Sequence, residues 1–139
     1  MHSTWPLSDA LVVRQCVAGY GGVPVLQGLD FSVGAGEVFG LLGRNGSGRS
    51  TLVKVLSGLL PYKGEVHLYG ERVVGIAPHQ LAGRGLSVVS QNRNIFPNLT
   101  VLQNLQLGWR KMPTSVAPVW TIDRLMDVFP ALGRRLASM

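Results

Sequence analysis

The stretch that decides the fold is residues 43–51, Gly43-Arg44-Asn45-Gly46-Ser47-Gly48-Arg49-Ser50-Thr51. It follows an apolar run at 38–42 and leads into the apolar-rich segment 52–56, so it predicts a glycine-rich turn between a strand and a helix. Glycines allow the backbone N–H groups of such a turn to point inward, and the helix start adds positive dipole at the same place. This arrangement suits the phosphates of a nucleotide.

The turn fits the phosphate-loop pattern GxxxxGK[ST] at every fixed position except one. Ser50 stands where the pattern places a hydroxyl that binds Mg²⁺, but Arg49 replaces the lysine. Arginine keeps the positive charge on a wider, planar group. We therefore expect the loop to keep phosphate binding, and hydrolysis is the activity that this substitution puts in doubt. The alternative is that residues 43–51 form an ordinary glycine-rich loop that binds no phosphate.

Length and composition limit the classes of protein to consider. The 139 residues suit a single domain or part of one, and 46% are hydrophobic against 14% charged, which predicts extensive burial or a partner. No apolar run reaches the roughly 20 residues of a membrane helix, and residues 1–6 do not resemble a signal peptide. The expectation is a cytosolic protein docked on a membrane complex.

The net charge of +6 would permit binding to nucleic acid, but the basic residues are scattered in runs of at most two and do not alternate with aromatic residues. We favour a solvated basic surface and no nucleic-acid partner. Cys16 is the only cysteine and lies in an apolar segment, which predicts a buried thiol. His2, His67 and His79 are too separated in sequence to indicate a metal site.

The remaining pattern predicts an α/β chain. Strands are expected at 11–17, 23–33, 37–42 and 85–89, with a β-ribbon at 64–73. Helices are expected at 50–59, at 78–83, from 101 with Thr100 as N-cap, and at 121–129. Residues 114–118 read as a proline-containing linker.

With these elements in order, the chain resembles the N-terminal half of the nucleotide-binding domain of an ABC transporter, a P-loop NTPase fold with an antiparallel β subdomain and an αβ core. The segment 18–21 resembles the A-loop, which implies that Tyr20 stacks on adenine. Gly43 to Thr51 resembles Walker A, which implies that these nine residues bind ATP. Residues 88–91 resemble the end of the Q-loop strand, which implies that Gln91 reaches Mg²⁺ and the attacking water. The segment 95–105 is similar to a stretch in the ATPase subunits of branched-chain amino acid or urea importers.

The resemblance spans residues 11 to about 137 and implies ATP and Mg²⁺ as cofactors, with Ser50 and Gln91 toward the metal. It also implies transmembrane permease subunits and a second nucleotide-binding subunit as partners, at the inner face of the plasma membrane. Each assignment has a simpler reading: Tyr20 as a surface turn residue, Gln91 as a polar loop residue, and Phe96 and Leu99 as core.

The signature, Walker B and switch-histidine segments of the family do not occur in residues 1–139, which we therefore interpret as a truncated nucleotide-binding domain. Residues 125–129 hold a single acidic residue at helical spacing and do not form Walker B. The expectation is an importer ATPase when intact, of the branched-chain amino acid type, but no hydrolysis by this chain alone. The alternative is a non-catalytic nucleotide-binding or interaction module.

Overall fold

The computed structural model describes residues 9–91, 94–108 and 120–138. The chain divides into two compact units at residues 89 and 90, and each unit is described by itself. The predicted linker at 114–118 lies outside the described residues.

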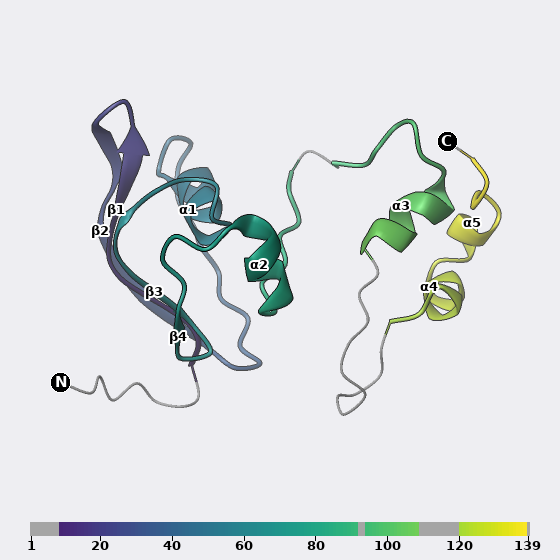
Figure 1. Cartoon of the computed structure of the whole chain (residues 1–139), viewed down its shortest axis with the longest axis horizontal. Helices are drawn as coiled ribbons and strands as arrows, with labels where there is room; N and C mark the ends of the chain where they lie inside the picture. The colour runs from purple at the N-terminus through teal and green to yellow at the C-terminus, as the bar shows by residue number, and fades with distance from the viewer. Residues whose placement is uncertain (1–8, 92–93, 109–119, 139) are drawn as a thin grey trace. The chain divides into compact units, whose positions relative to one another are not determined.

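The first unit is built on an antiparallel sheet of four strands in the order β2-β1-β3-β4 (Figure 1). The strands are β1 (Asp9–Tyr20), β2 (Val23–Gly34), β3 (Lys63–Leu68) and β4 (Glu71–Arg72). Gly21 and Gly22 form the β1–β2 turn with φ of 56° and 82°, conformations that glycine adopts without strain. The predicted strands at 11–17 and 23–33 and the predicted ribbon at 64–73 are confirmed.

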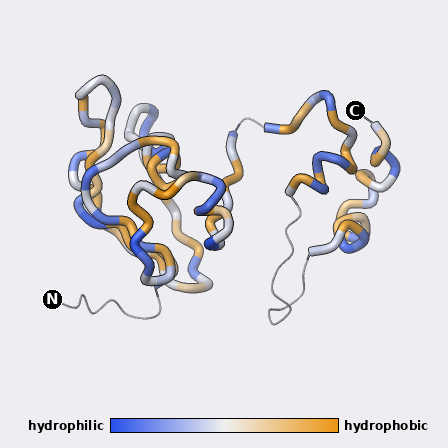
Figure 2. Tube along the Cα trace, in the orientation of Figure 1, coloured by the Kyte–Doolittle hydropathy of each residue, from blue (hydrophilic) through white to orange (hydrophobic). Residues whose placement is uncertain are grey.

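Two helices belong to this unit, α1 (Arg49–Leu56) and α2 (Pro78–Gly83). Leu52 and Val55 of α1 are buried in one core cluster with Val13, Cys16 and Leu26 of the sheet. Figure 2 shows hydrophobic stretches along the strands that form this core. The predicted burial of Cys16 is confirmed, and burial raises the pKa of its thiol. Both helices were predicted, and α1 ends three residues earlier than expected, before Ser57 and Gly58.

The predicted strands at 37–42 and 85–89 are not formed. Neither segment belongs to the sheet, and Val38, Leu42 and Val89 are more than 90% exposed. A strand requires a neighbour for its backbone N–H and C=O groups, and neither segment has one in the described part of the chain. Local contacts still hold residue 39, because the Phe39 ring stacks on Phe31 of β2 with 5.2 Å between ring centroids.

The second unit contains α3 (Val101–Gly108), α4 (Ile122–Val128) and α5 (Pro130–Gly133). Thr100 caps α3 as predicted: its Oγ1 accepts from the Gln103 N–H at 3.2 Å, and Gln103 Oε1 accepts from the Thr100 N–H at 2.8 Å. The next donors at the helix start are also used, because the N–H groups of Val101 and Leu102 donate to the carbonyls of Ser138 and Leu136. The start of α3 is therefore fully bonded and closed to a ligand.

Candidate phosphate-binding site

The glycine turn that precedes α1 has a backbone that only glycine adopts easily. Gly46 and Gly48 have φ of 83° and 92°, both in the left-handed region. A Cβ at Gly48 would lie 2.8 Å from Leu26 Cδ2, and one at Gly43 would lie 2.9 Å from Ser47 Cβ. Close packing therefore favours glycine at Gly43 and Gly48, and the backbone angle alone favours it at Gly46.

The start of α1 is open, in contrast to that of α3. Gly48 is its N-cap, no side chain caps it, and its first turn carries no acidic residue. The N–H groups of the first helical turn have no partners within a helix, so a bound anion can accept from them. The Leu52 N–H donates to the Gly48 carbonyl at 2.8 Å, which holds the turn against the helix. An uncapped helix start behind a glycine turn is the kind of place where proteins bind phosphate.

Arg49 and Ser50, the two residues with predicted roles beside the glycines, are both exposed on the first turn of α1. The side chain of Arg49 lies over the turn, with its Cδ 4.0 Å from the position of a Cβ at Gly43. Arg44, Asn45 and Ser47 are exposed as well, while Thr51 is buried at 6% exposure. Thr51 therefore anchors α1, and Ser50 is the accessible hydroxyl of the first helical turn.

Tyr20, at the end of β1, lies against α1. The Lys54 Nζ stands over the Tyr20 ring, 5.2 Å from its centroid. Hydrogen bonding by the side chains of Thr51 and then Lys54 lowers the pKa of the Tyr20 hydroxyl, since both partners stabilise the phenolate. The structure thus brings the predicted adenine-binding residue to the helix that begins at the phosphate loop. Sequence reasoning missed the involvement of Lys54; its signal was the spacing of three residues from Thr51, which places both on one helix face.

Gln91 is exposed and belongs to the second unit, so its approach to Ser50 stays a prediction. A hollow of about 350 Å³ borders Arg49 and the loop, between β2 and residues 41–42. A larger one, of about 570 Å³, is lined by residues such as Pro61, Tyr62 and Lys63 and includes neither Tyr20 nor the loop. We assign the site to the loop, because its N–H groups and helix dipole supply the chemistry that phosphate requires.

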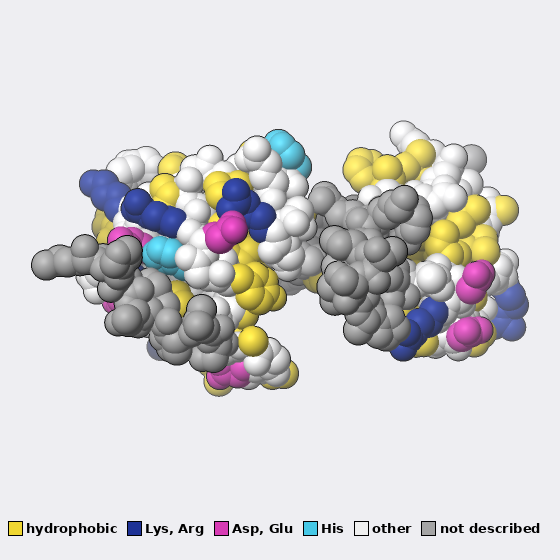
Figure 3. Space-filling model, turned by 60° about the horizontal axis from the view of Figure 1, so that its bottom comes forward, with side chains coloured by type: hydrophobic (Ala, Val, Ile, Leu, Met, Phe, Trp, Pro, Cys, Tyr) yellow, Lys and Arg dark blue, Asp and Glu magenta, His cyan; other side chains and the backbone are white. Residues whose placement is uncertain are grey.

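Charge and metal-binding groups elsewhere do not suggest a competing site. On the face drawn in Figure 3, basic side chains stand in separate groups with acidic ones beside some of them. Arg84 and Glu71 form an ion pair of 2.6 Å. Within residues 9–91, 94–108 and 120–138, no three His, Cys, Asp or Glu side chains are grouped to hold a metal. None of the helices in those ranges has the length and apolar character to cross a membrane.

The glycine cradle, the uncapped helix and the antiparallel sheet beside them define a P-loop NTPase fold. The family model for ABC transporters matches residues 26–137, and the chain belongs to that family. It is similar to a nucleotide-free ATP-binding cassette from an ABC transporter, with 27% identity and a TM-score of 0.66, covering 87% of this chain and 46% of that one.

Sequence relatives include the putative ribose/galactose/methyl galactoside import ATP-binding protein 1 of Rhizobium meliloti (strain 1021), 46% identical over 90 residues that make up 64% of this chain and 18% of that protein. Another is the ribose import ATP-binding protein RbsA of Lactococcus lactis subsp. lactis (strain IL1403), 41% identical over the same shares of the two chains. The chain thus spans about a fifth of the length of these relatives.

The narrower resemblance, to importers of branched-chain amino acids or urea, is not supported, because these relatives are named for ribose and other sugars. The stretch that suggested it, 95–105, has a local structural reason. Asn104 Oδ1 accepts from the Phe96 N–H at 2.9 Å, and its Nδ2 donates to the carbonyls of Phe96 and Leu99 at 3.1 Å. Together with the Thr100 cap, Asn104 holds the loop against α3. The sequence of this stretch is thus explained by local hydrogen bonding and does not identify a solute.

Proposed function

We propose that this chain is the nucleotide-binding part of an ABC importer ATPase of the ribose and sugar type, and that residues 1–139 supply its A-loop, Walker A and Q-loop segments. The observation that carries the proposal is the open start of α1 behind Gly46 and Gly48, with Tyr20 held against the same helix. The sugar assignment rests on the names of the relatives. A branched-chain amino acid substrate has no such support.

In this proposal the phosphates of ATP lie at residues 43–51. The Ser47 N–H already donates to the Arg44 carbonyl at 3.1 Å, so the phosphate donors are the N–H groups of Gly46 and of the residues from Gly48 to Thr51. Arg49 reaches over the turn with a planar group that can form paired hydrogen bonds. Tyr20 offers its ring to adenine, as aromatic side chains do for bases elsewhere.

The residues present also fit Mg²⁺. The metal keeps several waters and takes one or two protein ligands together with substrate phosphates, and the exposed Ser50 hydroxyl beside the loop meets that requirement. Bound there, Mg²⁺ would neutralise charge on the phosphates during transfer. Gln91 is the second proposed oxygen ligand and positions water. Hydrolysis further needs acidic residues that the sequence 1–139 does not place near Ser50, so we expect this chain alone to bind ATP without turnover.

The proposed partners follow from family membership. A second nucleotide-binding subunit would complete each ATP site, and transmembrane permease subunits would hold the pair at the inner face of the membrane. A second candidate function is nucleotide binding without turnover even in the complete protein. Arg49 favours it, because the replaced lysine is the residue of the pattern closest to the chemistry.

Calorimetry of the 139-residue chain with ATP tests the proposal. Ser50→Ala is expected to weaken binding of Mg-ATP but not of ATP in the presence of a chelator, because it removes only a metal ligand. Tyr20→Ala is expected to lose roughly 1 to 3 kcal/mol of ATP binding, and Tyr20→Phe little, if the base stacks on the ring.

Ser87→Ala, an exposed serine outside the loop, is the matched control for Ser50→Ala. Equal Mg-ATP binding by wild type and Ser50→Ala would remove Ser50 from the site. Phosphate-release activity of the 139-residue chain that vanishes in Ser50→Ala would contradict the expected lack of turnover.

A further inference from the structure

One face of the Tyr20 ring is covered by a side chain of α1. Lys54 Nζ lies over the ring, 5.2 Å from its centroid, and Tyr20 is 45% exposed. A cation over an aromatic ring is attracted by the electron density of the face it covers. One face is therefore engaged by α1, and a planar ligand must use the other.

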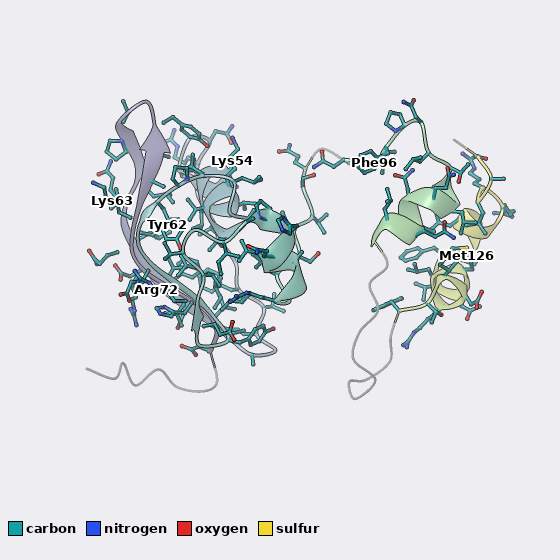
Figure 4. The ribbon with its side chains drawn as sticks, in the orientation of Figure 1. Lys54, Tyr62, Lys63, Arg72, Phe96 and Met126 are labelled. Carbon is teal, nitrogen blue, oxygen red and sulfur yellow. The ribbon has the colours of Figure 1, made fainter. Side chains whose placement is uncertain are left out.

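The position of Lys54 follows from the helix. It stands three residues after the buried Thr51, and the side chains of both residues lower the pKa of the Tyr20 hydroxyl. A spacing of three places both on one face of α1, the face that meets the end of β1. Figure 4 marks Lys54 at α1 and Lys63 on the sheet. One turn of α1 thus covers one face of the Tyr20 ring.

Resting on the proposed function, we infer that Lys54 is a positioning residue for the nucleotide base: it fixes the Tyr20 ring from the α1 side so that adenine stacks on the opposite face. A fixed ring loses less freedom when the base arrives. The lowered pKa of the Tyr20 hydroxyl agrees with this arrangement. Lys54 itself need not touch the ligand.

The inference predicts a loss that depends on the base. An exposed cation–π contact is worth about 0.5–1 kcal/mol, which corresponds to roughly a two- to fivefold change in affinity. Lys54→Met, which keeps the length of the side chain and removes its charge, is expected to weaken ATP binding by about that factor. Binding of inorganic tripolyphosphate, which has no base, should stay unchanged.

Two variants make the comparison specific. Lys54→Arg keeps a cation over the ring and should retain near-wild-type ATP affinity. Lys63→Met removes the same charge from an exposed lysine at the start of β3 and should affect neither ligand. A second readout is the ultraviolet titration of Tyr20, taken as the difference between each protein and its Tyr20→Phe version: the pKa should rise in Lys54→Met only, because a phenolate-stabilising partner is lost.

The experiment is therefore calorimetry of the full chain and these variants with ATP and with tripolyphosphate. A loss confined to ATP in Lys54→Met supports the inference. Unchanged ATP binding in Lys54→Met overturns the inference, and so does tighter binding, which would mean that Lys54 obstructs the base. An equal loss for ATP and tripolyphosphate also overturns it, because the effect would then come from charge alone. If wild type binds tripolyphosphate and Tyr20→Ala binds ATP as tightly as wild type does, the base site lies elsewhere in the protein. If wild type binds neither ATP nor tripolyphosphate, the proposed function itself fails.

Discussion

Arginine at position 49 is the residue that distinguishes this phosphate loop. Its stem lies over the turn at Gly43, so the positive charge reaches the loop, but the guanidinium is wider than an ammonium and prefers paired acceptors. Phosphoryl transfer depends on alignment of the attacking and leaving oxygens, and small displacements reduce rate more than affinity. The consequence is a site suited to holding phosphate and poorly suited to aligning it.

Arg49→Lys is therefore expected to raise hydrolysis at least about tenfold, equivalent to roughly 1.4 kcal/mol in the barrier, in a full-length cassette completed with the second half of a ribose-type relative. Steady-state phosphate release measures the effect, and ATP affinity should change less. Arg72→Lys, the same exchange at an exposed arginine of β4 outside the loop, is the control. If the Arg49 cassette is already as fast as its Arg49→Lys version, arginine is a tolerated substitute.

The two long helices show how the start of an element decides its use. α1 begins without a side-chain cap, whereas the first N–H groups of α3 all have partners from Thr100, Leu136 and Ser138. Of these two helices, α1 is the one whose first N–H groups can donate to an anion. The loop before α3 is held differently, because Asn104 hydrogen-bonds the backbone of Phe96 and Leu99. Phe96 itself is 59% exposed.

Asn104→Ala is expected to release this loop and to cost about 1–2 kcal/mol locally, because it removes the acceptor of the Phe96 N–H and a donor shared by three carbonyls. Hydrogen exchange followed by mass spectrometry should show faster exchange in peptides covering 95–100. Gln106→Ala, at an exposed position of α3, should leave these peptides unchanged. Identical exchange in Asn104→Ala and wild type would show that the loop is held by other contacts.

At the scale of the whole molecule, the first unit has a core on one sheet face but carries two unpaired apolar segments, 37–42 and 85–89. Val38, Leu42 and Val89 expose more than 90% of their surface, and the backbone of both segments lacks a strand neighbour within the described residues. Exposed apolar surface and free backbone groups favour association.

The purified chain is accordingly expected to bind a hydrophobic dye and to self-associate, and the double variant Val38→Lys/Val89→Lys should do both less, because it places charge on these segments. Light scattering coupled to gel filtration measures the association. Leu107→Lys, an equally polar change at a residue 61% exposed on α3, is the control. A monomeric wild-type chain that binds no dye would show that these segments are covered.

The sequence by itself determined the features that depend on near neighbours in the chain. The glycine loop, α1, α2 and the Thr100 cap were all predicted, because backbone angles, caps and helical spacing are set by residues within a few positions. Only the tertiary structure decided which apolar runs become strands and which side chains meet Tyr20. A strand exists through a neighbour distant in sequence, which 37–42 and 85–89 lack here, and the contact of Lys54 with Tyr20 requires α1 to pack beside the end of β1.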